Sequence, residues 1–176
     1  MKTRCGIVIV LVALATLLFA SLPAAAPASA SLNPYEQQIV KCINKERAKR
    51  HLASLRVNAK LVSAARAHSA DMGTPQKYFE HASRSGESWD RRIVRLGYSR
   101  SGYRVWKAGE NIAWGSGLYS SPVAIVRAWM KSSMHRAVIL TKSFRDLGVG
   151  AVSCDGYRSL KGMVWFFTLD LGRRAR

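Results

Sequence analysis

The chain has 176 residues, of which 28 are Lys or Arg and 10 are Asp or Glu, so its net charge is +18 at pH 7. Basic residues occur in every segment, and no helix-turn-helix, zinc-finger or aromatic-basic sheet signature accompanies them, which excludes the usual nucleic-acid-binding classes. The charge favours polyanionic surroundings such as anionic cell-wall polymer, lipid or glycan, or else a solvated basic surface with no dedicated partner.

Residues 1–30 have the pattern of a secretory signal peptide. Lys2 and Arg4 are followed by an uncharged apolar run, and the segment ends in the small-x-small sequence at 28–30. The alternative is an uncleaved membrane anchor, but the run is shorter than the roughly 18 to 20 residues of a spanning helix. We expect a secreted, extracellular protein, cell-wall associated or free, with a single domain over residues 31–176. Since two basic residues leave with the leader, this domain keeps a charge of +16.

The first half of the domain predicts helices. The stretch "SLNPYEQQIVKCINKERAKRHL" opens with Asn33, then Pro34 and Glu36, which is a capping-box start. A second helix is expected from Asn58 to Gly73, and "GESWDRRIVRLGY" predicts a third. His68 falls on the apolar face of the second helix, where a satisfied core histidine is the ordinary interpretation and a ligand role is the alternative.

The second half predicts a loop, a helix and two strands. Residues 101–120 are rich in glycine and serine, so we expect a long loop there, with room for one short strand. A helix restarts at Pro122, and residues 147–154 and 162–172 predict antiparallel strands joined through Asp155-Gly156. Helices first and strands last predict an α+β domain whose antiparallel sheet is covered by helices.

Cysteine usage predicts a disulfide. Cys5 lies in the leader, so Cys42 and Cys154 are the pair left in the exported chain. Two cysteines in an exported chain most often form a bond. Two separately buried thiols are the alternative.

Three residues could form a metal site. His81, Glu110 and His135 would supply two imidazoles and one carboxylate, a donor set that suits zinc, although their spacing carries no local signature. A nucleophile at Ser132 or Ser133 near His135 is the competing hypothesis. No Gly-x-Ser-x-Gly elbow surrounds these serines, and serines at helix ends are ordinarily caps.

Five segments resemble, in order, the bacterial branch of the CAP superfamily, which comprises cysteine-rich secretory, antigen 5 and pathogenesis-related class 1 proteins. They are "CINKERAKRHLASLRVNAKLVSAARAHSADM", "YFEHAS", "GENIAWGSG", "AWMKSSMHRAVIL" and "FRDLGVGAV". The resemblance implies a three-layer α-β-α sandwich and a central cleft lined by two histidines and two glutamates. His81, Glu110 and His135 match three of these positions, and Ser132 stands where the second glutamate is expected.

The resemblance leaves several functions open. We expect a secreted domain whose cleft binds a divalent metal such as zinc, or a small ligand, with no assignable reaction. One alternative is a metal-dependent extracellular hydrolase of the peptidase type. A single carboxylate serves poorly as both metal ligand and general base, so the serine at position 132 argues against hydrolysis. The other alternative is a basic cell-wall-associated binding protein. Trp106, Trp114 and Tyr119 are expected to shape the walls of the cleft.

Overall fold

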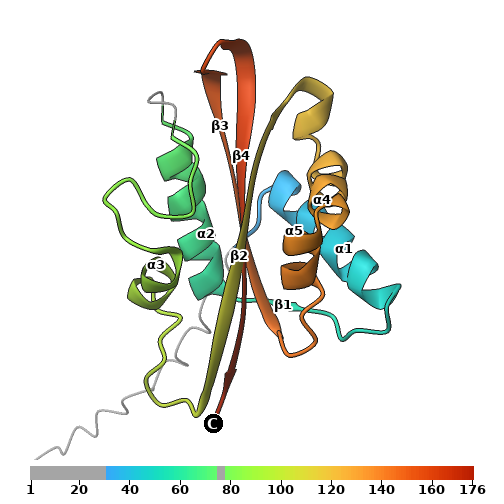
Figure 1. Ribbon diagram of the computed structural model, residues 1–176, viewed down its shortest axis with the longest axis vertical. Coiled ribbons are helices and arrows are strands. Elements are labelled where there is room, and N and C mark those ends of the chain that lie inside the picture. Colours follow the sequence, from blue (N-terminus) through green and yellow to red (C-terminus); the bar gives the residue numbers. More distant parts are fainter. Residues whose placement is uncertain (1–30, 75–77) are drawn as a thin grey trace, which may run out of the picture.

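The computed structural model describes residues 31–74 and 78–176, so the predicted signal peptide lies outside the described residues. The described chain forms three layers, with a four-stranded sheet between two layers of helices (Figure 1). In chain order the elements are α1 (Pro34–Ala48), β1 (Arg56–Val57), α2 (Ala59–Met72), α3 (Trp89–Arg95), β2 (Val105–Ser116), the 3-10 helix η1 (Gly117–Ser120), α4 (Pro122–Lys131), α5 (Ser133–Ile139), β3 (Asp146–Tyr157) and β4 (Leu160–Ala175). The predicted α+β class and α-β-α sandwich are confirmed.

The sheet has the order β1-β3-β4-β2, and β4 pairs antiparallel with both β3 and β2. The two-residue β1 adds a short parallel pairing with β3, which the sequence did not predict. β2 is therefore an edge strand. In Figure 1 it passes between the two helical layers, so segments from both layers can meet over it.

The two faces of the sheet pack against different helices. Helices α1, α4 and α5 cover one face, while α2 and α3 cover the other (Figure 1). On β4, Phe167 and Leu169 belong to the core under the first layer, and the alternate residue Phe166 packs with Met72 of α2. Helix α2 lies very close to the sheet, and glycine at position 148 permits this approach. A Cβ there would stand only 2.1 Å from the carbonyl carbon of Leu61.

The helix starts follow the capping pattern of the sequence. Asn33 accepts a hydrogen bond from the backbone N–H of Glu36 at 2.9 Å, and Glu36 accepts one from the backbone N–H of Asn33 at 2.9 Å, which completes the capping box. The side chain of Asn58 caps α2 in the same way, and that helix ends at Gly73. Both helices therefore begin where the sequence predicted.

The predicted loop over residues 101–120 is wrong for most of its length. Residues 105–116 form strand β2, which pairs with β4 without interruption from Val105 opposite Ala175 to Ser116 opposite Val164. The glycines there make room for neighbouring elements. A Cβ at Gly115 would lie 2.4 Å from the carbonyl oxygen of the 3-10 helix that follows.

The predicted turn of the β3–β4 hairpin is also displaced. Asp155 and Gly156 lie inside β3, at an irregularity in its register with β4, and the chain reverses at residues 158–159. Arg158 takes up the left-handed conformation there, with φ at 56°. A further helix, α5, separates from α4 because Ser132 is extended, with ψ at 126°.

The predicted disulfide between Cys42 and Cys154 is wrong, because both cysteines are free thiols in the structure. Cys42 lies on α1 and packs against the core under the first helical layer. Cys154 packs instead with Tyr157 and Phe166 on the α2 side of the sheet. A disulfide requires Cα atoms within about 7 Å, and here the sheet stands between the two side chains.

We expect Cys42 and Cys154 to be free thiols in the folded protein. Denaturation without a reductant, followed by maleimide, should label both Cys42 and Cys154 and give a mass with no two-hydrogen deficit. Burial raises the pKa of both thiols, so labelling should be slow before denaturation. An unlabelled protein that gains two labels only after reduction would contradict the structure.

Candidate functional site

The candidate site is built around Glu110 on the edge strand β2. Its carboxylate is buried, and Oε1 lies 2.8 Å from Nδ1 of His81. A carboxylate only accepts hydrogen bonds here, so Nδ1 of His81 is the donor and carries the hydrogen. The side chain of His81 is half-exposed. Glu110 thereby fixes the tautomer of His81 and leaves the lone pair of Nε2 for a ligand.

Arg92 of α3 holds the other oxygen of Glu110. Its guanidinium is only 1% exposed and donates to Oε2 of Glu110. It also donates to Oγ of Ser83 at 2.8 Å and to the carbonyl oxygen of His81 at 3.3 Å. One buried side chain therefore fixes β2, α3 and the segment that carries His81.

The sequence contained a signal for Arg92 that the prediction did not use. Trp89, Ile93 and Leu96 form the apolar stripe of the third helix, and Arg92 falls on the same stripe at helical spacing. A buried guanidinium needs acceptors for its hydrogen bonds, and here the carboxylate of Glu110 is one of them.

Asp170 of β4 is a second buried acid in the site, and it was also missed. It lies directly opposite Glu110 in the β2–β4 register and is fully buried. No described N–H or O–H donates to either of its oxygens. Burial, and then the charge of Glu110, raise the pKa of Asp170 well above its ordinary value, against the opposing effect of Arg92. A raised pKa favours the protonated form of Asp170 beside the carboxylate of Glu110.

The sequence signal for Asp170 was a lone acid in a buried strand. In "VWFFTLDLG" it is the one charged residue among strongly apolar neighbours. An acid at such a position indicates a polar neighbour on the same face of the sheet. Which residue that neighbour is depends on the strand register, and the sequence does not give the register. The family resemblance had implied a second carboxyl group at position 132, where this chain has serine. Asp170 instead supplies a second carboxyl group near Glu110.

His68 lies in the core next to this site. It is completely buried on α2, and its Nε2 lies 2.9 Å from the carbonyl oxygen of Glu80. Burial lowers its pKa, so the imidazole is neutral. The structure thus confirms the interpretation of His68 as a core histidine.

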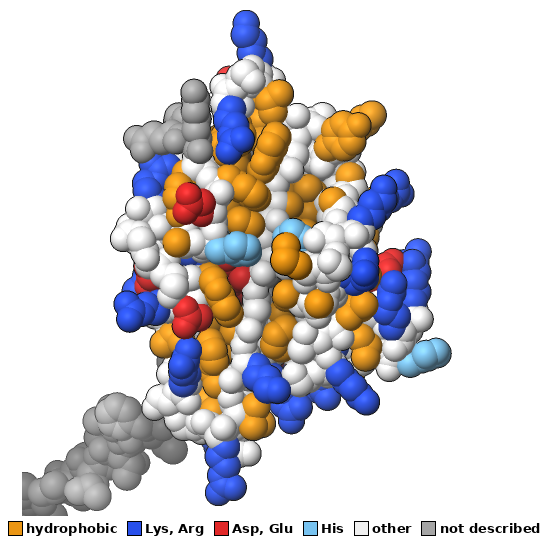
Figure 2. Space-filling model, in the orientation of Figure 1, with side chains coloured by type: hydrophobic (Ala, Val, Ile, Leu, Met, Phe, Trp, Pro, Cys, Tyr) orange, Lys and Arg blue, Asp and Glu red, His pale blue; other side chains and the backbone are white. Residues whose placement is uncertain are grey.

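His135 lies on α5, on the opposite side of β2 from α2. Asn111 follows Glu110 in the strand and donates to the carbonyl oxygen of His135 at 3.0 Å. Burial, and secondarily the charge of His81, lower the pKa of His135. The Asn111 hydrogen bond places the backbone of His135 beside the strand that carries Glu110, and Figure 2 shows histidine side chains at the middle of this face. The structure therefore joins His81 to Glu110 by a hydrogen bond and places the backbone of His135 against the next residue of the same strand.

Ser132 occupies the junction between α4 and α5. Its backbone N–H donates to the carbonyl oxygen of Ala128 at 3.2 Å, and its side chain makes no capping hydrogen bond. The predicted aromatic walls do not gather around the site. Trp106 and Trp114 lie eight residues apart on β2, and Tyr119 projects from η1 with its side chain exposed.

The fit of a metal ion depends on which donors are available. Within residues 31–74 and 78–176, no three His, Cys, Asp or Glu side chains are grouped so that they could hold a metal ion. Both oxygens of Glu110 are already engaged, and the guanidinium of Arg92 beside it disfavours a cation. Glu110 is therefore unavailable as the third ligand, and two imidazoles remain. A carboxylate behind a ligating histidine is the usual outer-shell partner in metal sites.

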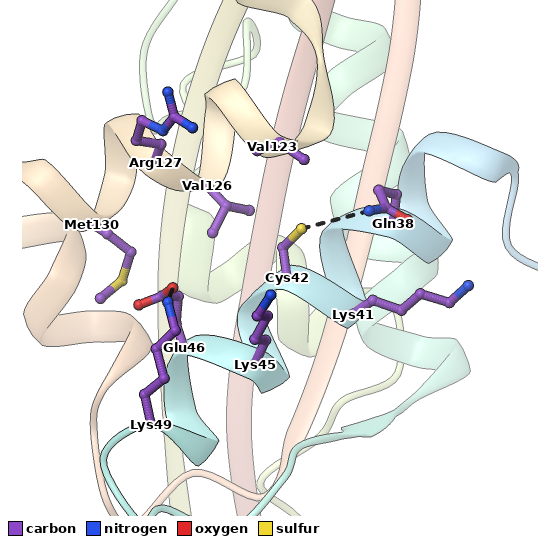
Figure 3. Close-up of a pocket in the computed structure, with 10 residues that line it drawn as sticks. All are labelled: Gln38, Lys41, Cys42, Lys45, Glu46, Lys49, Val123, Val126, Arg127 and Met130. Atoms are coloured by element: carbon purple, nitrogen blue, oxygen red, sulfur yellow. Dashed lines mark hydrogen bonds and ion pairs between the residues drawn. The ribbon is translucent and has the colours of Figure 1, made fainter.

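Cavities of the described residues lie beside this histidine site and away from it. One of about 460 Å³ lies between α1 and α4 (Figure 3), with Cys42, Val126 and Met130 among its lining residues and lysines along its rim. It is on the other face of the sheet from Glu110. A second, of about 540 Å³, includes Ser83 and Arg92 and so adjoins the buried side of the site.

Comparison with known proteins gives a family match. The model of the cysteine-rich secretory protein family, CAP, matches residues 40–171. The chain is 36% identical over 138 residues to the Bacillus subtilis protein YkwD, covering 78% of this chain and 48% of that protein. It is 33% identical over 115 residues to the Bacillus subtilis membrane protein YlbC, covering 65% of this chain and 31% of that protein. The chain spans about half or less of the length of these relatives.

Solved structures give the same fold. An extracellular protein containing an SCP domain, from Bacillus anthracis, matches with a TM-score of 0.61 and 29% identity, over 82% of this chain and 45% of that one. An outer surface protein of Borrelia burgdorferi matches with a TM-score of 0.58, over 80% of this chain and 92% of that one. At 16% identity the second likeness concerns the fold alone.

Proposed function

The chain belongs to the cysteine-rich secretory protein (CAP) family, and we propose that it is an extracellular binding domain whose His81–Glu110–His135 site captures a divalent metal ion or a small ligand. The contact that carries this proposal is the 2.8 Å hydrogen bond from Nδ1 of His81 to Glu110. The leader-like residues 1–30 and the extracellular relative from Bacillus anthracis support the location outside the cell.

The shared chemistry of the two ligand classes is the lone pair of a neutral imidazole. Glu110 directs the hydrogen of His81 to Nδ1, so Nε2 can bind a metal ion or accept a hydrogen bond. His135 offers a second imidazole, and burial favours its neutral form by lowering its pKa. A zinc ion held there would supply Lewis acidity to a ligand in its open positions.

The arrangement of carboxyl groups supports binding rather than hydrolysis. A metal-assisted hydrolase needs a carboxylate that can take a proton from water. Glu110 is engaged by Arg92 and His81, and Asp170 is fully buried with a raised pKa. Neither is placed to act as a free base at the surface, so a peptidase-like activity is not the function we propose.

Zinc should bind to the exported protein at pH 7.5 and should bind at least about tenfold more weakly to His135→Ala, because one of two imidazole ligands is lost. Lowering the pH to 5.5 should weaken binding further, since protons compete for imidazole nitrogen. Calorimetry measures both effects.

The control for this titration is His51→Asn. His51 lies in a surface turn away from the site at φ 55°, a conformation that asparagine tolerates. Equal heats for wild type and His135→Ala would contradict a metal site. Wild type could instead bind no zinc but carry a small organic molecule after purification. If His135→Ala lacked that molecule, the imidazoles would be assigned to an organic ligand.

The net charge supports a second proposal, which concerns the surface rather than the site. A chain of charge +18 is attracted to anionic cell-wall polymer and lipid. This attraction is independent of His81, so it can coexist with ligand binding.

A further inference from the structure

Exposed apolar side chains gather at one end of the molecule. Leu118 and Tyr119 of η1 are 90% and 80% exposed, and Met163 of β4 is 57% exposed. Val123 at the start of α4 and Leu160 at the hairpin turn are exposed as well. We call these five residues the apolar tip.

The strand register brings the parts of the apolar tip together. Ser116 pairs with Val164, so the chain enters η1 next to Met163. Figure 1 shows η1 and the β3–β4 hairpin at the same end of the molecule, and Figure 2 shows hydrophobic and basic side chains there. An exposed apolar group of this kind is uncommon on a protein that only meets water.

Basic residues accompany the apolar tip. Two basic residues lie on the hairpin. Arg158 precedes Leu160, and Lys161 lies between Leu160 and Met163. Neither forms an ion pair with any carboxylate of the described residues, and the guanidinium of Arg158 lies 5.3 Å from the ring centre of Tyr157. Asp155 is the one acid among residues 153–165, which surround the hairpin turn. The tip is therefore both apolar and positively charged.

We propose that the apolar tip docks onto an anionic lipid surface. Leucine and methionine can enter the boundary between headgroups and acyl chains, tyrosine favours that boundary, and Lys and Arg gain from anionic headgroups. A second copy of this chain would meet the tip with the same positive charge. An anionic polymer alone would offer no apolar phase for Leu118. Of these three partners, only an anionic lipid surface provides both an apolar phase for the exposed side chains and negative charge for Arg158 and Lys161.

Docking by the tip would be peripheral. Among residues 31–74 and 78–176, no helix is long and apolar enough to cross a membrane. The tip is far along β2 from Glu110, since η1 begins beyond the end of that strand. Lipid docking and ligand binding at the histidine site are therefore separable by mutation.

Vesicle flotation of the exported protein tests the apolar part. Wild type should float with vesicles of equal phosphatidylglycerol and phosphatidylcholine at 0.15 M salt, and much less with phosphatidylcholine alone. Leu118→Ser with Tyr119→Ser should reduce binding at least about tenfold. Met134→Ser is the matched control, because Met134 is 76% exposed but belongs to α5 rather than the tip.

A second pair of variants tests the basic part. Arg158→Gln with Lys161→Gln should weaken binding about tenfold, whereas Arg104→Gln with Lys107→Gln should have a much smaller effect. The control pair removes the same charge at the opposite end of β2. Three results would overturn the proposal. These are no flotation of wild type, equal losses for the two charge pairs, or unchanged flotation of the Leu118 and Tyr119 variant.

Discussion

Arg92→Ala should lower the free energy of unfolding by about 3–5 kcal/mol, because it leaves the Glu110 carboxylate buried without its cation. The loss should exceed that of an ordinary surface substitution, which falls within about 0.5 kcal/mol. Arg92 is 1% exposed and also donates to Ser83 and to the carbonyl oxygen of His81. Urea unfolding measures the change.

Two further variants make this experiment specific. Arg91→Ala removes the neighbouring, exposed arginine of α3 and should leave stability nearly unchanged. Arg92→Met combined with Glu110→Gln removes both charges together and should recover part of the loss, because no buried charge is then left alone. If Arg92→Ala were as stable as Arg91→Ala, the buried pair would not hold the site together.

The loss of Arg92 should also reach the ligand site. Its guanidinium fixes both Glu110 and the backbone of His81, so its removal lets the imidazole leave its oriented position. In the zinc titration, Arg92→Ala should therefore bind zinc more weakly than wild type, even at temperatures where the variant is still folded. This follows from positioning, because Arg92 itself is not placed as a ligand.

Local sequence signals predicted the helices well and the edge strand poorly. The capping residues Asn33 and Asn58 lie within a few positions of the groups they bind, so their role is readable from the sequence alone. Strand β2 contains glycines that resemble a loop pattern. They are there because α5 and η1 press against the strand, as Gly109 beside Val138 shows. Contacts of that kind are set by tertiary packing.

The site shows the same division. The family resemblance supplied His81, Glu110 and His135. The structure joins the first two by a hydrogen bond and places the backbone of His135 next to Asn111 of the same strand. The resemblance could not supply Asp170, because its pairing with Glu110 depends on the register of two strands some 60 positions apart in the chain. The disulfide failed for a related reason. Cysteine counting says nothing about which face of the sheet each thiol occupies, and Cys42 and Cys154 are on different faces.

Asp170→Asn should become progressively more stable than wild type as the pH rises from 4 to 7. Burial and the Glu110 charge raise the folded-state pKa of Asp170 above the value of 3.8 that applies in the unfolded chain. Below pH 3.8 both states carry the proton and there is no difference. Above it the unfolded chain ionises while the folded protein keeps its proton, so wild type loses about 1.4 kcal/mol for each pH unit up to the folded-state pKa.

Asparagine removes this loss because it cannot ionise. The charged groups facing Asp170 are Glu110 and Arg92, and the Asn variant retains both, so the change isolates one proton. Unfolding in urea at pH 4, 5.5 and 7 measures the difference between the two proteins. Asp155→Asn, on the exposed hairpin, should give a difference that hardly changes with pH. A difference for Asp170→Asn that stays constant or reverses as the pH rises would mean that Asp170 is ionised in the fold. The acid would then repel Glu110 rather than hold it, and Arg92 would have to neutralise two carboxylates instead of one.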